Sequence, residues 1–311
     1  MKVLVTGGGG FIGSNLVEEL VSLGHSVTVV DDLSSARKDY ESLVEKNKLV
    51  EYVFNTFACE EILEKLKSKS FDIVFHVAAI PRVAYSVEEP SKTTDVNIGE
   101  TVKLLESCKG NIKRFIFSSS SSVYGGADIM PTPTSHPKCP KSPYAWQKSC
   151  IEDLIAMFCS LYDFDAVSLR YFNVFGPGQF GGSAYSTAIS AWCHAIKHKT
   201  ALRKDGTGEQ SRDMCYIDNV VAANVGAMGR EQAMAGETFN VACGDRTSNN
   251  EILDHFEKKF GPLNVTHAPF RPGDVMHTRA DISKTIEALN YEPKVRFWEG
   301  LQKTFAWWNL V

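Results

Sequence analysis

A tyrosine and a lysine four residues apart are the first candidates for chemistry in this sequence. They are Tyr144 and Lys148 in the stretch KSPYAWQKSC. Side chains at positions i and i+4 of a helix share one face, so the two would project side by side. Tyrosine has an ordinary pKa of about 10, and a neighbouring ammonium favours its phenolate. Such a pair can act as a general base for a sugar or alcohol hydroxyl, although an exposed Tyr–Lys pair has the same spacing.

A run of five serines is the second candidate. Ser118–Ser122 follow a short apolar stretch in RFIFSSSSSVYGG. A low-complexity loop, a helix-capping tract and one catalytic hydroxyl among inert neighbours are all compatible with the run alone. The choice depends on what the rest of the chain supplies.

A glycine-rich turn supplies a candidate cofactor site. The stretch TGGGGFIG spaces Gly7, Gly10 and Gly13 as GxxGxxG. Glycine permits a tight turn and lets the backbone approach a pyrophosphate at a helix N-terminus. Asp31 follows about 20 residues later, where a carboxylate can bind a ribose 2′-hydroxyl and repel a 2′-phosphate. A plain glycine-rich turn is the other reading, but the flanking strand and helix favour dinucleotide binding, with NAD preferred over NADP.

Alternating strands and helices must position these residues. Apolar runs predict strands over 2–7, 26–32, 71–79, 113–119 and 166–173. Helical periodicity falls between them, with Leu16, Leu20 and Leu23 on one stripe and Gly24 as a stop. Further helices are expected over 60–69, 95–108 and 144–162, the last with Ser142 as N-cap and Pro143 at the first position. This alternation predicts an α/β, Rossmann-type doubly wound parallel sheet.

The pattern of predicted strands and helices changes after Asn173. A Gly-rich loop, VFGPGQFGGS, leads into mixed helices and short strands. We therefore expect a first domain of residues 1–173, with segments of about 215–244 returning to it. Residues 174–214 and 245–311 would form a smaller C-terminal α/β substrate lobe.

Bulk composition limits the class of protein. The chain has 311 residues, 43% of them hydrophobic and 23% charged, with a formal net charge of −4. No long basic run or apolar span occurs, so no nucleic-acid or membrane partner is expected. The N-terminus lacks the apolar region of a signal peptide, and eight cysteines are spread without a CxxC pair. A reduced cytoplasmic setting with no metal site is therefore expected.

Several motifs together make the sequence resemble the extended short-chain dehydrogenase/reductase family, and within it the nucleotide-sugar 4-epimerases. The matching stretches are TGGGGFIG, VVDDLS, HVAA, NIGET, SSSSSVYG, YAWQK, LRYFNVFGP, RDMCYIDNV and RPGDVMHTRADISK. They span essentially the whole chain. The resemblance implies NAD as cofactor, a UDP-sugar as substrate, and a homodimer formed through the helices at Asp95–Cys108 and Tyr144–Tyr162 as a four-helix bundle.

The resemblance also implies roles for individual residues. Ser120, four residues before Tyr124, would assist at the substrate O4, Tyr144 would remove its proton, and Lys148 would hold the nicotinamide ribose. The residues expected at the cofactor are Gly7, Gly10, Phe11, Ile12, Gly13, Asp31, Asp32, Asn55, Thr56, Val77, Ala78, Ala79, Asn97, Tyr144, Lys148 and Tyr171. The residues expected at the UDP-sugar are Arg82, Val83, Ser120, Ser122, Tyr144, Asn173, Arg212, Arg271, Asp274 and Thr278.

Two further positions bear on the reaction and the sugar. Related 4,6-dehydratases and UDP-glucuronate decarboxylases carry acidic residues where this chain has Ser121 and Ser122, so elimination and decarboxylation are disfavoured. Glucose/galactose-restricted epimerases carry a bulky tyrosine where alignment places Thr278. A small residue there leaves room for a 2-acetamido group, which favours the UDP-N-acetylglucosamine/UDP-N-acetylgalactosamine pair. UDP-glucose/UDP-galactose, UDP-glucuronate and a non-catalytic NAD-binding sensor remain the alternatives.

Overall fold

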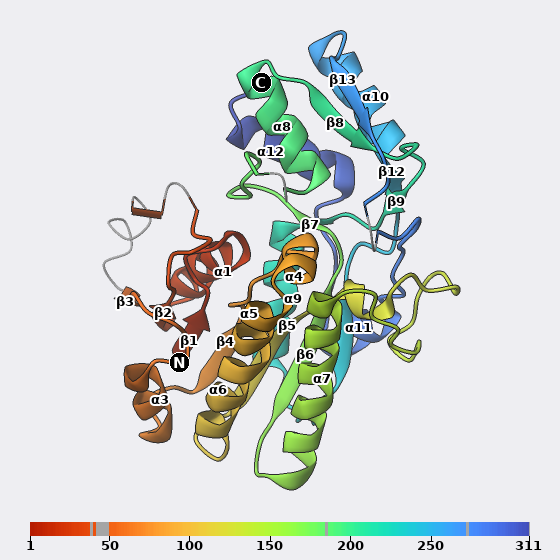
Figure 1. The fold of residues 1–311 in the computed structure, drawn as a ribbon. Helices are drawn as coiled ribbons and strands as arrows, with labels where there is room; N and C mark the ends of the chain where they lie inside the picture. The colour runs from red at the N-terminus through yellow and green to blue at the C-terminus, as the bar shows by residue number, and fades with distance from the viewer. Residues whose placement is uncertain (38–39, 42–49, 184–185, 272–273, 311) are drawn as a thin grey trace.

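The computed structural model describes residues 1–37, 40–41, 50–183, 186–271 and 274–310 (Figure 1). Its centre is a seven-stranded sheet in which every pair of neighbouring strands is parallel. The strands are β1 (Lys2–Thr6), β2 (Ser26–Val30), β3 (Val50–Val53), β4 (Ile73–His76), β5 (Arg114–Ser120), β6 (Ala166–Tyr171) and β11 (Thr238–Val241). Their order is β11-β6-β5-β4-β1-β2-β3. The predicted Rossmann-type sheet is confirmed, and the chain reverses its direction of travel across the sheet between β1 and β4, where such folds bind ligands.

Helices cover both faces of this sheet. One face carries α1 (Phe11–Ser22), α9 (Ile217–Gly229) and α11 (Ser283–Leu289). Helix α9 lies between the other two and contacts both. The other face carries α3 (Glu60–Lys67), α6 (Thr101–Cys108) and α7 (Pro143–Leu161). Short helices α4 (Val83–Glu88) and α5 (Pro90–Thr94) pack against α7. An apolar core lies on each face of the sheet, and the core on the α1 and α9 side continues into the smaller lobe described below.

One predicted helix begins where expected, whereas another is wound differently from the expected α-helix. The helix of Tyr144 begins as expected, because the Ser142 hydroxyl accepts a hydrogen bond from the Ala145 N–H at 3.2 Å and Pro143 follows the cap. The helix expected over 95–108 is instead wound as a π-helix, η1, over Asp95–Glu100 before α6 begins. Such wider turns rotate side chains out of the regular helical order. This rotation matters for Asn97, described below.

A smaller lobe lies above the carboxyl ends of the central strands (Figure 1). Its paired strands are β7 (Val174–Phe175) with β10 (Cys215–Tyr216), β8 (Leu202–Asp205) with β13 (Val265–Ala268), and β9 (Ser211–Arg212) with β12 (Thr247–Ser248). Its helices are α8 (Ala188–His198), α10 (Asn249–Phe260) and α12 (Phe297–Trp307). A 3₁₀ turn, η2 (Ser121–Tyr124), follows β5 below it. No helix among the described residues is both long and apolar enough to cross a membrane.

A buried carboxylate joins the lobe to the sheet. One oxygen of Asp213 accepts the Cys243 N–H at 2.9 Å, and the other accepts the N–H groups of Gly244 and Ala280, each at 3.0 Å. Burial raises the pKa of Asp213 to about 7, while these N–H donors oppose the rise. Three segments distant in sequence are thereby held at one side chain.

Candidate active site

A cavity of about 870 Å³ lies between the carboxyl edge of the sheet and the lobe. Of the residues predicted for the site, those on its wall are Gly7, Gly10, Phe11, Ile12, Gly13, Asp31, Asp32, Thr56, Val77, Ala78, Ala79, Arg82, Val83, Ser120, Ser122, Tyr144, Tyr171, Asn173, Arg212, Arg271, Asp274 and Thr278. The fold therefore gathers residues from both halves of the chain around one space.

The glycine turn forms one end of this cavity. A Cβ on Gly13 would lie 2.1 Å from the Gly7 carbonyl oxygen, and Gly7 itself has a φ of +71°. Any side chain at Gly13 would therefore push the first turn of α1 away from the loop. The open N-terminus of α1 presents backbone N–H groups to the cavity, which is the arrangement that binds a pyrophosphate.

Asp31 ends β2 beside this turn. Its carboxylate accepts the Gly9 N–H at 2.9 Å and the Leu33 N–H at 2.8 Å. Burial raises the pKa of Asp31 above its usual range, and both N–H donors oppose that rise. Each oxygen of an ionised carboxylate can accept a second hydrogen bond. Asp31 is thus oriented by the backbone and still able to accept from a ribose hydroxyl.

Tyr144 and Lys148 lie where strand β5 and helix α7 meet. The Lys148 ammonium donates to the Ser118 carbonyl at 2.7 Å and lies 4.6 Å from the centroid of the Phe117 ring. Burial lowers the pKa of Lys148 to about 7, although the charge of Glu152 opposes this. Burial also raises the pKa of Tyr144 to about 12, and a hydrogen bond with Ser120 opposes that. Lys148 lies beneath the cavity wall rather than on it.

The five serines divide by position. Ser118–Ser120 complete β5, and Ser121 and Ser122 begin η2. The Ser118 hydroxyl lies 3.1 Å from that of Tyr171, away from Tyr144. The Ser120 hydroxyl accepts from the Ser122 N–H at 3.2 Å and from its hydroxyl at 2.9 Å. Ser120 is consequently the serine whose hydroxyl is both on the cavity wall and bonded to Tyr144.

Besides Lys148, two other predicted cofactor residues lie off the cavity wall. The Asn97 side chain accepts from the Ile80 N–H at 2.8 Å and donates to the Ile80 carbonyl at 3.2 Å and to Gln147 at 2.8 Å. The π-helical turn directs it to this loop, so it shapes the wall at Ile80 from behind. Asn55 accepts from the neighbouring Thr56 N–H at 2.8 Å and is exposed. Thr56, not Asn55, lines the cavity.

The smaller lobe contributes arginine side chains to the cavity wall, and each of them pairs with an aspartate. Arg212 pairs with Asp274 at 2.5 Å, and Arg271 pairs with Asp205 at 2.7 Å. Arg203 also pairs with Asp205, at 2.6 Å. Guanidinium groups suit a diphosphate because several N–H donors lie in one plane. The arrangement gives the lobe end of the cavity the chemistry of an anion site.

Thr278 and Asn173 meet at the junction of the two parts. The Asn173 amide donates to the Thr278 hydroxyl at 3.2 Å, and the Asp213 N–H donates to the same hydroxyl at 3.2 Å. Thr278 is therefore a fixed part of the wall. Asn173 has a positive φ of 23°, which an asparagine tolerates better than most residues.

Sequence reasoning missed several residues on the cavity wall. They are Arg37, Lys141, Arg203, Asp205 and Gln210. Lys141 stands just before the Tyr144–Lys148 pair, whereas the other four stand in no motif whose spacing indicates a site. Arg203 and Asp205 lie on β8, which pairs with β13. Among the described residues, no group of three or more His, Cys, Asp or Glu side chains is arranged to hold a metal ion.

Comparison with known proteins agrees with this geometry. Residues 3–242 match the family described as NAD dependent epimerase/dehydratase. The chain is 34% identical to a UDP-glucose 4-epimerase of Mycolicibacterium smegmatis over 98% of this chain and 97% of that one. Its structure resembles a UDP-N-acetylglucosamine 4-epimerase of Methanobrevibacter ruminantium in complex with UDP-N-acetylmuramic acid, with a TM-score of 0.91, 34% identity, and coverage of 99% and 98%. A UDP-glucose 4-epimerase of Thermotoga maritima with UDP-glucose gives a TM-score of 0.92, 33% identity, and coverage of 100% and 99%.

Proposed function

The chain belongs to the NAD-dependent epimerase/dehydratase family and is an NAD-dependent UDP-sugar 4-epimerase, and we propose that it interconverts UDP-N-acetylglucosamine and UDP-N-acetylgalactosamine. The observation that carries the proposal is Thr278 on the cavity wall. Its small side chain is held by Asn173 and the Asp213 N–H, so it leaves space that a tyrosine ring would fill. That space suits a 2-acetamido group.

The residues at the β1–α1 turn fit NAD. The N–H groups at the start of α1 would hold the pyrophosphate, and Asp31 would accept from the adenosine ribose. When bound, NAD accepts a hydride from the sugar C4 and returns it, so the reaction has no net redox change. Gly13 lies so close to the Gly7 carbonyl oxygen that no side chain fits there. The turn that would hold the pyrophosphate therefore requires glycine at this position.

Three side chains would take part in proton transfer at the O4 atom of the substrate sugar. The ionised Tyr144 hydroxyl would take the O4 proton while the C4 hydrogen leaves as hydride, which yields a 4-keto sugar. Ser120 would hold O4 through its hydroxyl. The Lys148 ammonium stabilises the phenolate form, since an adjacent positive charge lowers the pKa of tyrosine. After the keto sugar presents its other face, Tyr144 would return the proton to O4.

The lobe holds the rest of the substrate. Arg212 and Arg271 would bind the UDP diphosphate, and Asp274 would accept from its ribose. Each arginine already pairs with a carboxylate, which helps to orient its guanidinium group. The sugar would be enclosed by other residues of the cavity wall, namely Arg82, Val83 and Ser122.

One experiment tests the sugar assignment. The protein is incubated separately with UDP-glucose, UDP-galactose and their two N-acetylated counterparts, and products are identified by NMR. Thr278→Tyr should lower turnover of the acetylated pair at least tenfold relative to the other pair, whereas Thr278→Ser should leave the ratio unchanged. A ratio unaffected by the tyrosine would exclude Thr278 as the gate.

Two other sugars have specific support. The relatives from Mycolicibacterium smegmatis and Thermotoga maritima are named for UDP-glucose, which makes the non-acetylated pair the second candidate. Lys141 and Arg82 add positive charge to the cavity wall, which would suit a uronate. Preferential turnover of UDP-glucuronate, added to that assay as a fifth substrate, would favour this third candidate.

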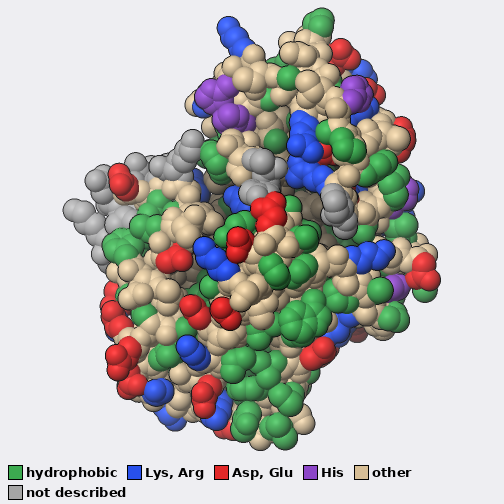
Figure 2. Space-filling model, in the orientation of Figure 1, with side chains coloured by type: hydrophobic (Ala, Val, Ile, Leu, Met, Phe, Trp, Pro, Cys, Tyr) green, Lys and Arg blue, Asp and Glu red, His purple; other side chains and the backbone are tan. Residues whose placement is uncertain are grey.

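We also propose a cytoplasmic homodimer with the domain division given above. The helices α6 and α7 expose apolar side chains, including Val102, Met157 and Leu161. Figure 2 shows hydrophobic side chains gathered on the lower part of the face that carries these helices in Figure 1. Leu161→Glu should shift the mass measured by light scattering from dimer to monomer. A wild-type protein that is monomeric by light scattering would contradict the proposed dimer.

The rival from another class is a non-catalytic NAD sensor. A pure binding module has no need of a serine–tyrosine–lysine group at the cavity. Turnover by the wild type, abolished in a Tyr144→Phe variant that still binds NAD, would exclude the sensor.

A further inference from the structure

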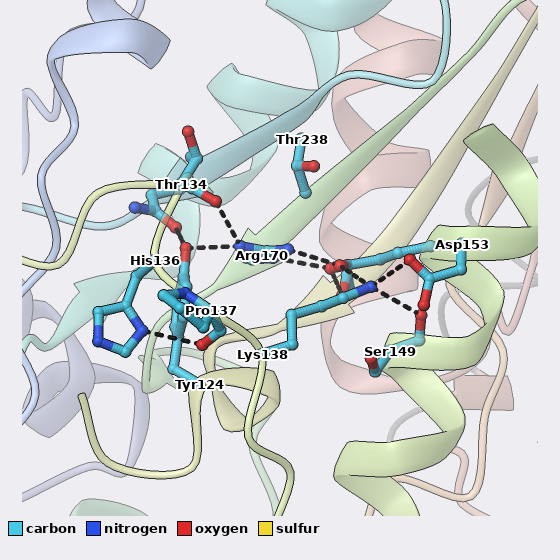
Figure 3. A network of polar contacts seen from close by, with 12 residues as sticks. Tyr124, Thr134, His136, Pro137, Lys138, Ser149, Asp153, Arg170 and Thr238 are labelled. Carbon is cyan, nitrogen blue, oxygen red and sulfur yellow. Dashed lines mark hydrogen bonds and ion pairs between the residues drawn. The ribbon is translucent and has the colours of Figure 1, made fainter.

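A buried ion pair lies directly behind the catalytic group. Arg170 of β6 donates to Glu152 of α7 through Nε at 2.8 Å and through Nη2 at 2.6 Å. Each side chain is only 4% exposed. Figure 3 shows Arg170 reaching toward Tyr124 and Thr134 on its other side, at 2.8 Å and 3.1 Å. Neither charge lines the cavity, so the pair is not explained by substrate binding.

Stability alone is a poor explanation for such a pair. Removing two charges from water costs several kcal/mol per ion, and a well-packed apolar pair is often as stable. The position of the pair is more informative. Tyr144, Lys148 and Glu152 are spaced four residues apart on α7, so they follow one another along a single helix face.

The same pair is tied to the serine strand. The Ser119 hydroxyl donates to Glu152 at 2.6 Å, and Ser119 is opposite Arg170 in the pairing of β5 with β6. The preceding carbonyl, of Ser118, accepts from Lys148 at 2.7 Å. Two adjacent serines therefore fasten β5 to α7 immediately before Ser120.

The charge of Glu152 also acts on Lys148. Burial works against the Lys148 ammonium and lowers its pKa to about 7, whereas Glu152 raises it. His76 of β4 lies near Lys148, but burial and the Lys148 charge lower its pKa, so it stays neutral and adds no second positive charge. Glu152 is thus the carboxylate that offsets the burial of this ammonium.

We propose that Glu152, held by Arg170, is a positioning residue of the epimerase: it keeps Lys148 charged beside Tyr144 and sets Ser120 through Ser119. The inference rests on the proposed function for the reaction it serves. The pair acts through Lys148 and the serine strand, and it touches neither substrate nor cofactor.

Other titratable groups surround the pair and must be considered in a test. Lys138 lies 3.7 Å from Glu152 and pairs with the exposed Asp153 at 2.5 Å. The Tyr124 hydroxyl accepts from Arg170 and donates to Asn240 at 2.7 Å. His136, paired with Asp128, packs against the Tyr124 ring. Asp153→Asn therefore provides a matched control, because it removes a carboxylate from the next position of α7 at the edge of the same network.

The informative variant removes both charges. Glu152→Gln alone would leave Arg170 buried and unpaired, which can prevent folding. Glu152→Gln/Arg170→Gln leaves no unpaired charge at the pair, and Glu152→Gln keeps the length of that side chain. Ser119→Ala is the complementary variant, since it removes the strand contact and retains both charges.

The primary measurement is the titration of Lys148 itself in the NAD-bound protein. With ¹³C-labelled lysine and Lys148→Arg to assign the signal, NMR gives the midpoint in each variant. We expect the double variant to lower the midpoint, because the lost Glu152 charge favours the Lys148 ammonium and the simultaneous loss of the Arg170 charge offsets only part of that change. Asp153→Asn and Ser119→Ala should leave it unchanged. Equal midpoints in wild type and double variant, or an equal fall in Ser119→Ala, would overturn the inference.

Activity supplies a second, separable measurement. The high-pH limb of kcat/KM should move to lower pH in the double variant, whereas Ser119→Ala should lower kcat several-fold with the limb unmoved. An unmoved limb in the double variant would contradict the inference. Failure of wild type to turn over N-acetylated sugars would refute the proposed substrate instead, and the NMR midpoints would still decide the role of Glu152.

Discussion

The Lys148 ammonium lies 5.9 Å from the centroid of the Tyr144 ring, one helical turn along α7. It is anchored there by the Ser118 carbonyl, not by a carboxylate. A carbonyl acceptor positions the ammonium without neutralising it. Its positive charge therefore remains available to stabilise a phenolate at Tyr144, whose pKa burial would otherwise hold at about 12.

Tyr144→Phe should lower kcat by about 10²- to 10⁴-fold, the range supplied by a positioned general base. NAD affinity should change little, because the phenyl ring retains the buried packing. Tyr162→Phe, at an exposed position just after α7, is the matched control and should retain full turnover. Steady-state kinetics with fluorescence titration of NAD separates the two effects. Turnover that survives in Tyr144→Phe would remove this residue as the base.

Ser120→Ala should reduce kcat by about 10²-fold, since the hydroxyl bonded to Tyr144 and open to O4 is lost. Ser121→Ala changes the next serine, which also lines the cavity, and should remain within about twofold of wild type. Similar losses in both variants would mean that the catalytic hydroxyl has been assigned to the wrong serine.

Gly13→Ala should impair NAD binding and destabilise the fold. The added methyl would lie 2.1 Å from the backbone oxygen of Gly7, so the turn and α1 must separate. The expected loss is about 1–3 kcal/mol of unfolding free energy, typical of forced overpacking. Urea unfolding and bound-NAD content measure it. Gly99→Ala is the control, because a Cβ there meets no atom within 4 Å, and it should bind NAD normally.

Asp213→Asn should destabilise the protein by about 2 kcal/mol at pH 7.5, because an amide cannot accept all three N–H donors. Asp245→Asn, nearby and exposed, should have little effect. The pH dependence provides a second check. The folded pKa of about 7 exceeds the ordinary 3.8, so the folded state retains a proton that the unfolded chain has lost between those values.

The sign of that dependence follows directly. The contribution of Asp213 to the free energy of unfolding is complete below about pH 4 and is lost as pH rises toward about 7. Asp213→Asn should flatten this part of the wild-type profile. A profile of unchanged slope would show that Asp213 titrates normally.

The sequence alone determined the features that depend on neighbours along the chain. The Tyr144–Lys148 spacing, the Ser142 cap and the glycine turn are local, and the structure has all three as expected. Alternating strand and helix patterns also sufficed for the parallel sheet. Each of these follows from helix period, strand period or backbone sterics within a short window.

Tertiary structure decided which side chains meet. Asn97 turns to Ile80 because η1 is wound as a π-helix, a choice that local pattern does not reveal. Arg203 lines the cavity from β8, which pairs with β13. Glu152 and Arg170 come together because α7 packs across β5 and β6, and no short-range rule relates residues on two separately packed elements. Sequence spacing thus placed the catalytic pair, and packing of distant segments supplied its charge environment.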